Sequence, residues 1–202
     1  MQIGLAAGRA ADLTAQLLAL GRRQTLQSQV VDLNELVQNL EDMLSRLAGD
    51  HVALELDLDP ALDFVRVDPA QVEQVLVNLV ANAADAMNGT GSIAVRTTNA
   101  DVHGTDERPD LPAGRYAVLS VEDSGPGIDE ATLEQLFEPF FTTKDVGRGI
   151  GLGLATAYGI AKQSGGTIVV DSEPGRGSIF SVYLPAATEA VPERVTEKPI
   201  SA

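Results

Sequence analysis

The feature of this sequence that most constrains its fold is the uneven distribution of its glycines. Eleven of the 19 glycines in the 202-residue chain lie between Gly125 and Gly177. Glycine clustered in this way marks backbone that bends tightly or closely approaches a ligand. The segment therefore predicts ligand-binding loops rather than one continuous regular element.

The composition excludes several classes of function. Hydrophobic residues make up 44% of the chain, which is enough for a core, while 14 Lys+Arg against 29 Asp+Glu give a net charge of −15. Such a surface repels phosphate backbones and anionic lipids. The chain has no cysteine, no apolar run near the roughly 18–20 residues of a membrane span and no signal-peptide pattern. We therefore expect a cytoplasmic protein with no nucleic-acid partner and no direct membrane contact.

Hydrophobic periodicity predicts an α/β domain preceded by a helix. The helix at 9–27 has a narrow apolar seam, which either packs on the main domain or forms half of a helical hairpin. Asp32 and Glu35 predict a capping box before a helix that ends near Leu47. Strands are predicted at 51–57, 64–67, 92–98, 116–122, 167–171 and 178–184, and further helices at 69–87, 130–136 and 151–163.

This order of elements does not alternate as βαβ units do. It predicts a two-layer α/β sandwich, with a mixed sheet and helices packed on one face. Residues 187–202 carry two prolines and several charges without any period, so we expect a disordered tail.

Three polar residues share one face of the predicted helix at 69–87. Asn78, Asn82 and Asp85 are spaced i, i+4 and i+7, and the opposite side carries apolar residues. A solvated polar stripe would explain any one of them. Because asparagine is a poor helix former, however, the pair within an apolar helix favours a ligand. Amide oxygens can complete a magnesium shell whose other ligands are phosphates and water.

Two glycine motifs and a segment between them add to this site. In the first motif, at 123–128, a carboxylate is followed by Gly-x-Gly. The carboxylate can accept a hydrogen bond from an exocyclic amine while the glycine backbone lies against a flat ring. The alternative interpretation is an ordinary turn. The second, 147–155, runs into a helix whose free N–H groups can bind an anion, and it is not a Walker loop. The segment 137–144 holds three of the five phenylalanines, which indicates a movable flap.

In this order, the motifs resemble the N, G1, F and G2 boxes of the ATP-binding catalytic domain of sensor histidine kinases. These belong to the gyrase, heat-shock chaperone and MutL ATPase superfamily, with its Bergerat-type fold. The boxes read Asn-x-x-x-Asn-Ala, Asp-x-Gly-x-Gly, Phe-Glu-Pro-Phe-Phe-Thr-Thr-Lys and Gly-x-Gly-Leu-Gly-Leu-Ala. A further glycine-rich box matches at 172–178, so the resemblance implies a catalytic domain at 32–186.

The resemblance implies ATP and Mg²⁺ as cofactors and assigns roles to single residues. Asn82 becomes the magnesium ligand, Asp123 accepts from the adenine amine, and Lys144 reaches the γ-phosphate, while Asn78 is a polar group on the metal or phosphate side. We expect Lys144 and Asn78 to be catalytic. The other expected nucleotide contacts are Asp85, Gly125, Gly127, Ile128, Phe137, Gly147, Gly149, Gly151, Leu152, Gly153, Leu154 and Ser178. The family commonly has Thr where this chain has Ile150, and often Thr at position 178.

Residues 1–31 resemble the second helix of the dimerisation and phosphoacceptor hairpin, whose first helix is absent from this chain. The resemblance thus implies a kinase that transfers the γ-phosphate of Mg-ATP to a histidine on that hairpin. Its further partners would be a response-regulator receiver domain and, in the full-length parent, a second copy. His51 and His103 lack the helical context of a phosphoacceptor, so we expect no autophosphorylation of this chain.

Two other functions stay open at this point. One is a non-catalytic nucleotide-binding regulatory module. The other is a slow ATPase or a serine kinase of the same superfamily. Asn78 stands where the ATPases carry the glutamate that activates water, so hydrolysis should be slow.

Overall fold

The computed structural model describes residues 27–103, 111–144 and 150–188. The helix predicted at 9–27 lies almost wholly outside these ranges, as do Gly147, Gly149 and residues 189–202 of the predicted tail. The domain boundary predicted near residue 31 therefore stays a prediction.

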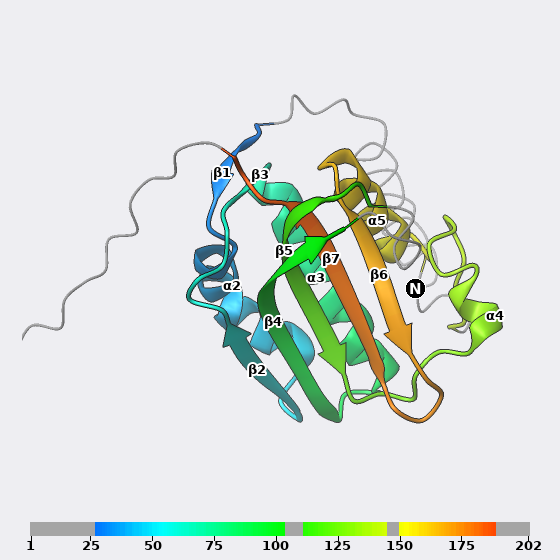
Figure 1. Cartoon of the computed structure of the whole chain (residues 1–202). Helices are drawn as coiled ribbons and strands as arrows, with labels where there is room; N and C mark the ends of the chain where they lie inside the picture. The colour runs from blue at the N-terminus through cyan, green and yellow to red at the C-terminus, as the bar shows by residue number, and fades with distance from the viewer. Residues whose placement is uncertain (1–26, 104–110, 145–149, 189–202) are drawn as a thin grey trace, which may run out of the picture.

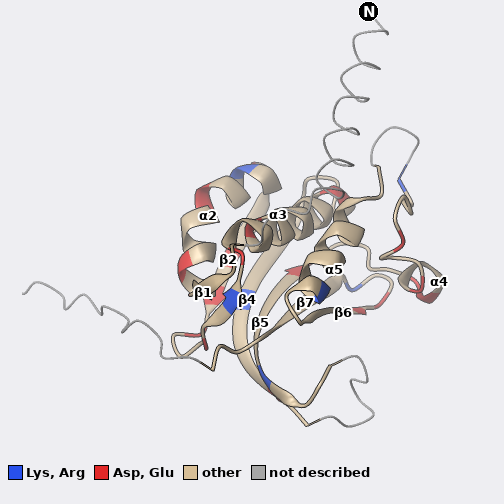
Figure 2. Cartoon of the chain, turned by 90° about the horizontal axis from the view of Figure 1, so that it is seen from above, with Lys and Arg blue, Asp and Glu red and all other residues tan. Residues whose placement is uncertain are grey.

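The described chain forms a five-stranded mixed sheet with helices on one face. The strand order is β2-β4-β5-β7-β6, where β2 pairs parallel to β4 and the other pairs are antiparallel. The strands are β2 (Val52–Leu58), β4 (Gly91–Val102), β5 (Gly114–Asp123), β6 (Thr167–Ser172) and β7 (Ser178–Pro185). Helices α2 (Leu33–Ala48), α3 (Pro69–Ala86) and α5 (Gly153–Gln163) lie behind the sheet in Figure 1, and Figure 2 shows the two layers edge-on. The predicted two-layer sandwich is confirmed.

The main core fills the space between the sheet and the helices. Strand residues that point to this side, such as Ile93, Leu119 and Val121, meet the apolar face of α3. On α3, Val75, Leu76 and Leu79 are at most 1% exposed, as their helical spacing predicts. The opposite face of α3 is thereby left to form a wall of a cavity.

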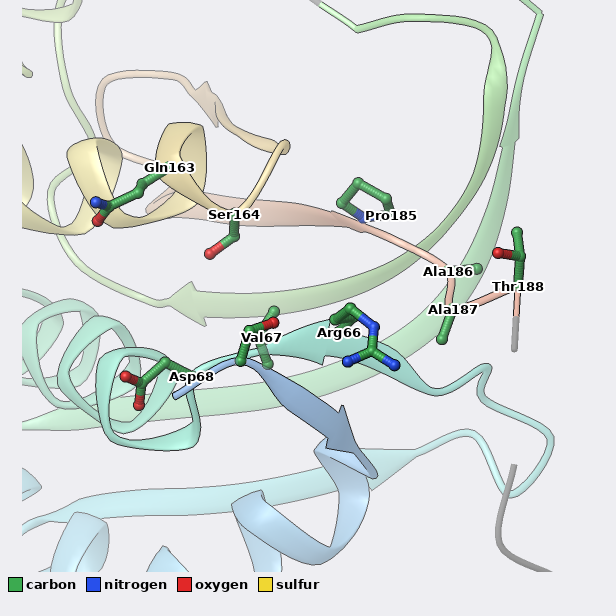
Figure 3. Close-up of a pocket in the computed structure, with 10 residues that line it drawn as sticks. Arg66, Val67, Asp68, Gln163, Ser164, Pro185, Ala186, Ala187 and Thr188 are labelled. Atoms are coloured by element: carbon green, nitrogen blue, oxygen red, sulfur yellow. The ribbon is translucent and has the colours of Figure 1, made fainter. Parts of the chain in front are cut away.

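A small two-stranded sheet was not predicted from the sequence. Strand β1 (Gln29–Val31) pairs antiparallel with β3 (Val65–Val67), and Ala186 bridges to Val65 from the other side. The first and last described segments therefore meet on β3. A cavity of about 350 Å³ opens here, with Arg66, Asp68 and Gln163 among its lining residues (Figure 3).

Aspartate side chains cap the N-termini of three helices. Asp32 accepts from the Asn34 N–H at 2.9 Å, Asp68 from Ala70 at 3.1 Å, and Asp129 from Thr132 at 2.8 Å. These three carboxylates cap α2, α3 and the short α4 (Glu130–Leu133), which is one turn rather than the predicted 130–136. Side-chain oxygens at this position satisfy N–H groups that have no partner inside the helix.

Helix α5 begins differently. Leu152 occupies its N-cap position and makes no side-chain cap hydrogen bond. The first N–H groups of α5 are therefore left for another acceptor.

Candidate functional site

A cavity of about 1080 Å³ lies between α3, the start of α5 and the loops that follow β5. It is lined by most of the residues that the sequence singled out. These are Asn78, Asn82, Asp85, Asp123, Gly127, Ile128, Lys144, Gly151, Leu152, Gly153, Leu154 and Ser178.

Helix α3 contributes a polar wall to the cavity. Asn78, Asn82 and Asp85 line it, and the Asn78 Nδ2 donates to the Gly153 carbonyl at 3.1 Å. This bond ties the middle of α3 to the first residue of α5. Gln71 and Gln74 extend the same face toward the start of α3, and the sequence analysis missed them. Their signal was available, because they continue the helical spacing of Asn78 backward by one and two turns.

The buried carboxylate of Asp123 lies at the end of β5. Asp123 is 5% exposed, and its Oδ1 accepts from the Gly125 N–H at 2.8 Å. Burial raises the pKa of the Asp123 carboxyl, while hydrogen bonds from Gly125 and Ser178 oppose that rise. The carboxylate thus forms a desolvated acceptor in the wall of the cavity, where a hydrogen bond to a ligand amine is strong.

The glycine turn after Asp123 is fastened to the turn between β6 and β7. Gly127 has φ +72°, and a Cβ at this position would overlap the Glu173 carbonyl. The Ile128 N–H donates to Ser172 Oγ at 2.9 Å, and the Gly175 N–H donates to the Pro126 carbonyl at 2.6 Å. Glycine at 127 is therefore required by the contact between two turns, independently of any ligand.

The uncapped end of α5 opens onto the cavity. Residues 151–155 line it, and this end of the helix carries the positive pole of the dipole. The Phe140 N–H donates to the Gly151 carbonyl at 2.9 Å, which joins the two ends of the loop that contains the undescribed residues 145–149. Free N–H groups and the dipole together form an anion site of the kind that binds phosphate.

Lys144 brings a positive charge to this cavity. Among the described residues that line it, Lys144 is the only lysine or arginine, and its Nζ lies 2.7 Å from Asp85 Oδ2. Ile150, where the family commonly has Thr, also lines the cavity.

Of the three phenylalanines of the flap, Phe141 lines the cavity and the other two do not. The ring of Phe137 stacks on Tyr158 at 4.6 Å between centroids, and Phe137 is not among the described lining residues. Phe140 is 58% exposed and has φ +71°, which is unusual for a residue with a side chain. Gly125 lies beside Asp123 and is also not among these lining residues.

The donor set fits a metal that takes most of its ligands from elsewhere. Within residues 27–103, 111–144 and 150–188, no three His, Cys, Asp or Glu side chains are grouped to hold a metal ion. The amide oxygens of Asn82 and Asn78 are hard, neutral ligands in a cavity wide enough for phosphates and water. Mg²⁺ prefers such a shell to a cage made only of protein.

Comparisons with known proteins identify the family of this chain. Residues 67–188 match the family model described as histidine kinase-, DNA gyrase B- and HSP90-like ATPase. A sensor kinase named CckA from Brucella abortus (strain 2308) is 47% identical over 205 residues, which is 100% of this chain and 21% of that protein. The sensor histidine kinase ZraS of Klebsiella oxytoca is 37% identical over 91% of this chain and 38% of its own length. The chain thus spans well under half the length of these relatives.

Solved structures of known proteins resemble this chain as well. The crystal structure of full-length ShkA in complex with AMPPNP superposes with a TM-score of 0.66 at 25% identity, over 82% of this chain and 32% of that one. The catalytic domain of the histidine kinase ThkA gives a TM-score of 0.61 at 28% identity, over 79% and 96% of the two chains.

The chain belongs to the histidine kinase-, DNA gyrase B- and HSP90-like ATPase family. Within that family, the predicted resemblance to the ATP-binding catalytic domain of sensor histidine kinases is confirmed. None of the helices in the described part of the chain has the length and apolar character needed to cross a membrane.

Proposed function

We propose that this chain binds Mg-ATP in the 1080 Å³ cavity and transfers its γ-phosphate to a histidine on a helical hairpin. The observation that carries the proposal is the convergence of three groups on one cavity. These are the buried acceptor Asp123, the amide face of α3 and the uncapped start of α5. They suit an adenine ring, a metal–phosphate complex and a phosphate chain, respectively.

In this mechanism the protein mainly positions its substrate. Asp123 accepts from the adenine amine, and the N–H groups at the start of α5 hold the phosphates. Asn82, with Asn78 beside it, would hold Mg²⁺, which when bound neutralises charge on the phosphates. Lys144 supplies a further positive charge near the terminal phosphate. Phosphoryl transfer depends largely on such positioning and charge stabilisation.

The reaction itself occurs on the partner hairpin. A neutral imidazole nitrogen attacks the γ-phosphorus, a P–N bond forms, and the bond from the γ-phosphorus to the bridging oxygen breaks to release ADP. A carboxylate on the hairpin, next to the histidine, takes the imidazole proton. The exposed ring of Phe140, beside the cavity, gives the hairpin an apolar contact.

The geometry favours transfer over hydrolysis. Asn78 has no basic group to activate water, and its amide nitrogen donates to Gly153. We further propose that residues 1–31 belong to the hairpin, that the parent is a homodimer, and that a response-regulator receiver domain accepts the phosphoryl group. In this proposal the domain works in the cytoplasm, where ATP is available.

Labelled ATP tests the proposal directly. The full chain is incubated with γ-labelled ATP and Mg²⁺, with or without a separate hairpin that carries the phosphoacceptor histidine. We expect acid-labile label on the hairpin alone and little release of free phosphate. Label on the chain by itself, or rapid phosphate release without the hairpin, would contradict the proposal.

Asn82→Ala provides the matched control for this assay. We expect this variant to lose most magnesium-dependent ATP affinity and to keep its fold, because Asn82 faces the cavity and not the core. Binding is followed with a fluorescent ATP analogue, since the chain contains no tryptophan. If the variant bound ATP with the same magnesium dependence as the wild type, Asn82 would not be a metal ligand.

A further inference from the structure

The ion pair between Asp85 and Lys144 is placed where the proposed mechanism needs a free cation. Asp85 lies in the last turn of α3, and Lys144 lies 59 residues further on, in the segment that follows α4. Their charged atoms are 2.7 Å apart, and both residues line the cavity. The Asp85 carboxylate therefore pairs with the same ammonium group that would meet a terminal phosphate.

The position of Asp85 is unfavourable for the helix that carries it. The C-terminal end of a helix carries the negative pole of its dipole, so an acidic side chain there is disfavoured and a basic one is preferred. The last turn of α3 has no basic residue of its own. The stability of α3 thus does not explain why Asp85 is acidic, whereas Lys144 relieves both the carboxylate and the helix end.

The charge balance of the cavity makes this pair consequential. Asp85, Asp123 and Asp129 are acidic lining residues, and Lys144 is the sole basic one in the described part of the lining. The side chains of Asp85 and Lys144 are 59% and 30% exposed. A partly solvated ion pair of this kind is weak enough to be exchanged for a stronger partner. A terminal phosphate, with its higher charge density, is such a partner.

We propose that Asp85 is a positioning residue for Lys144. Its carboxylate holds the ammonium group at the cavity wall and releases it to the terminal phosphate when ATP binds. This inference rests on the proposed binding of ATP in the cavity. The pair therefore opposes ATP more than ADP, because ADP lacks the phosphate to which Lys144 is transferred.

A double-mutant cycle with Asp85→Asn, Lys144→Met and the double variant tests the exchange. Affinities for ATP and ADP are measured with Mg²⁺ by displacement of a fluorescent ATP analogue from the full chain. We expect Asp85→Asn to tighten ATP binding about fivefold and ADP binding by less than about twofold. In the Lys144→Met background the same change should alter ATP affinity by less than about twofold.

A matched control separates the local pair from the overall charge. Asp42→Asn makes the same chemical change at an exposed position on α2, outside the described cavity lining, and should leave both affinities unchanged. The inference is overturned if Asp85→Asn weakens or does not change ATP binding. It is equally overturned if the gain is as large for ADP, or as large without Lys144. Failure of the wild-type chain to bind ATP would instead contradict the proposed function.

Discussion

Helices α3 and α5 pack against each other in one layer, yet they begin in opposite ways. Asp68 caps the start of α3 with one carboxylate oxygen, and its other oxygen accepts from the Gln27 N–H at 3.2 Å. The start of α5 has glycine at its first position and no side-chain acceptor. A cap is thus present where a helix needs only stability, and it is absent where the helix end faces the cavity. We interpret the missing cap as space for phosphate.

The largest effect is expected when a carboxylate is placed at the start of α5. A Cβ at Gly153 would lie 3.8 Å from the Asn78 side chain, which is an ordinary contact. We expect Gly153→Asp to reduce ATP affinity by about 100-fold or more, because the new charge repels the phosphates. Thermal stability should hold or rise, since an acidic residue favours a helix start. Calorimetric titration and thermal unfolding give the two readouts.

Gly153→Ala controls for the added bulk alone. It should bind ATP within about threefold of the wild type, because its methyl group fits the available space. Equal losses in the alanine and aspartate variants would show that size, and not charge, disrupts this end of α5.

The next effect concerns Asp123, the buried acceptor in the cavity lining. We expect Asp123→Asn to weaken ATP binding about tenfold, because a neutral amide is a poorer acceptor than a carboxylate. The same change should stabilise the fold by about 1 kcal/mol at pH 7, because it removes a buried charge.

The stabilisation of the fold by Asp123→Asn should depend on pH. Burial raises the pKa of the Asp123 carboxyl, so the folded chain keeps this proton to a higher pH than the unfolded chain. The cost of the charge is therefore absent below the unfolded pKa and grows as pH rises through the folded pKa. The stability advantage of Asp123→Asn should accordingly disappear toward pH 3 in urea unfolding. An advantage that persisted at low pH would assign it to something other than the charge.

The smallest effect is expected from removal of the cap at the start of α3. Asp68→Ala should cost about 1 kcal/mol of stability, while Asp68→Asn should restore most of it, because asparagine is an equally good cap. Both variants should bind ATP nearly as the wild type does. Chemical unfolding measures the first effect. A large change in ATP affinity in Asp68→Ala would mean that the start of α3 also serves the ligand.

The sequence predicted the elements that have a strong local signal. The strands predicted at 51–57 and 178–184 correspond to β2 and β7, and the predicted cap Asp32 begins α2. Strand β1 was missed because three residues show no clear alternation, and its pairing with β3 is a long-range contact. Strands β4 and β5 are longer than predicted, because their pairing continues through Asp101 and Arg115 at ends where the apolar pattern has stopped.

In the candidate site, too, local patterns were predictable from the sequence and long-range contacts were not. Helical spacing alone predicted that Asn78, Asn82 and Asp85 share one face, and all three line one wall of the cavity. No local pattern could pair Asp85 with Lys144, or stack Phe137 on Tyr158, because each pair joins segments far apart in the sequence. The role of Gly127 was similarly hidden, since the backbone it contacts belongs to another turn.

Backbone amide NMR shows whether the uncapped start of α5 binds the phosphates of ATP. The isotope-labelled chain is titrated with Mg-ATP, and the amides of 151–155 are compared with those of 34–36 at the capped start of α2. We expect large shifts and slowed hydrogen exchange at 151–155 on binding, with the start of α2 unchanged. If saturating ATP left the amide resonances of 151–155 unshifted, the phosphates would not bind at the start of α5.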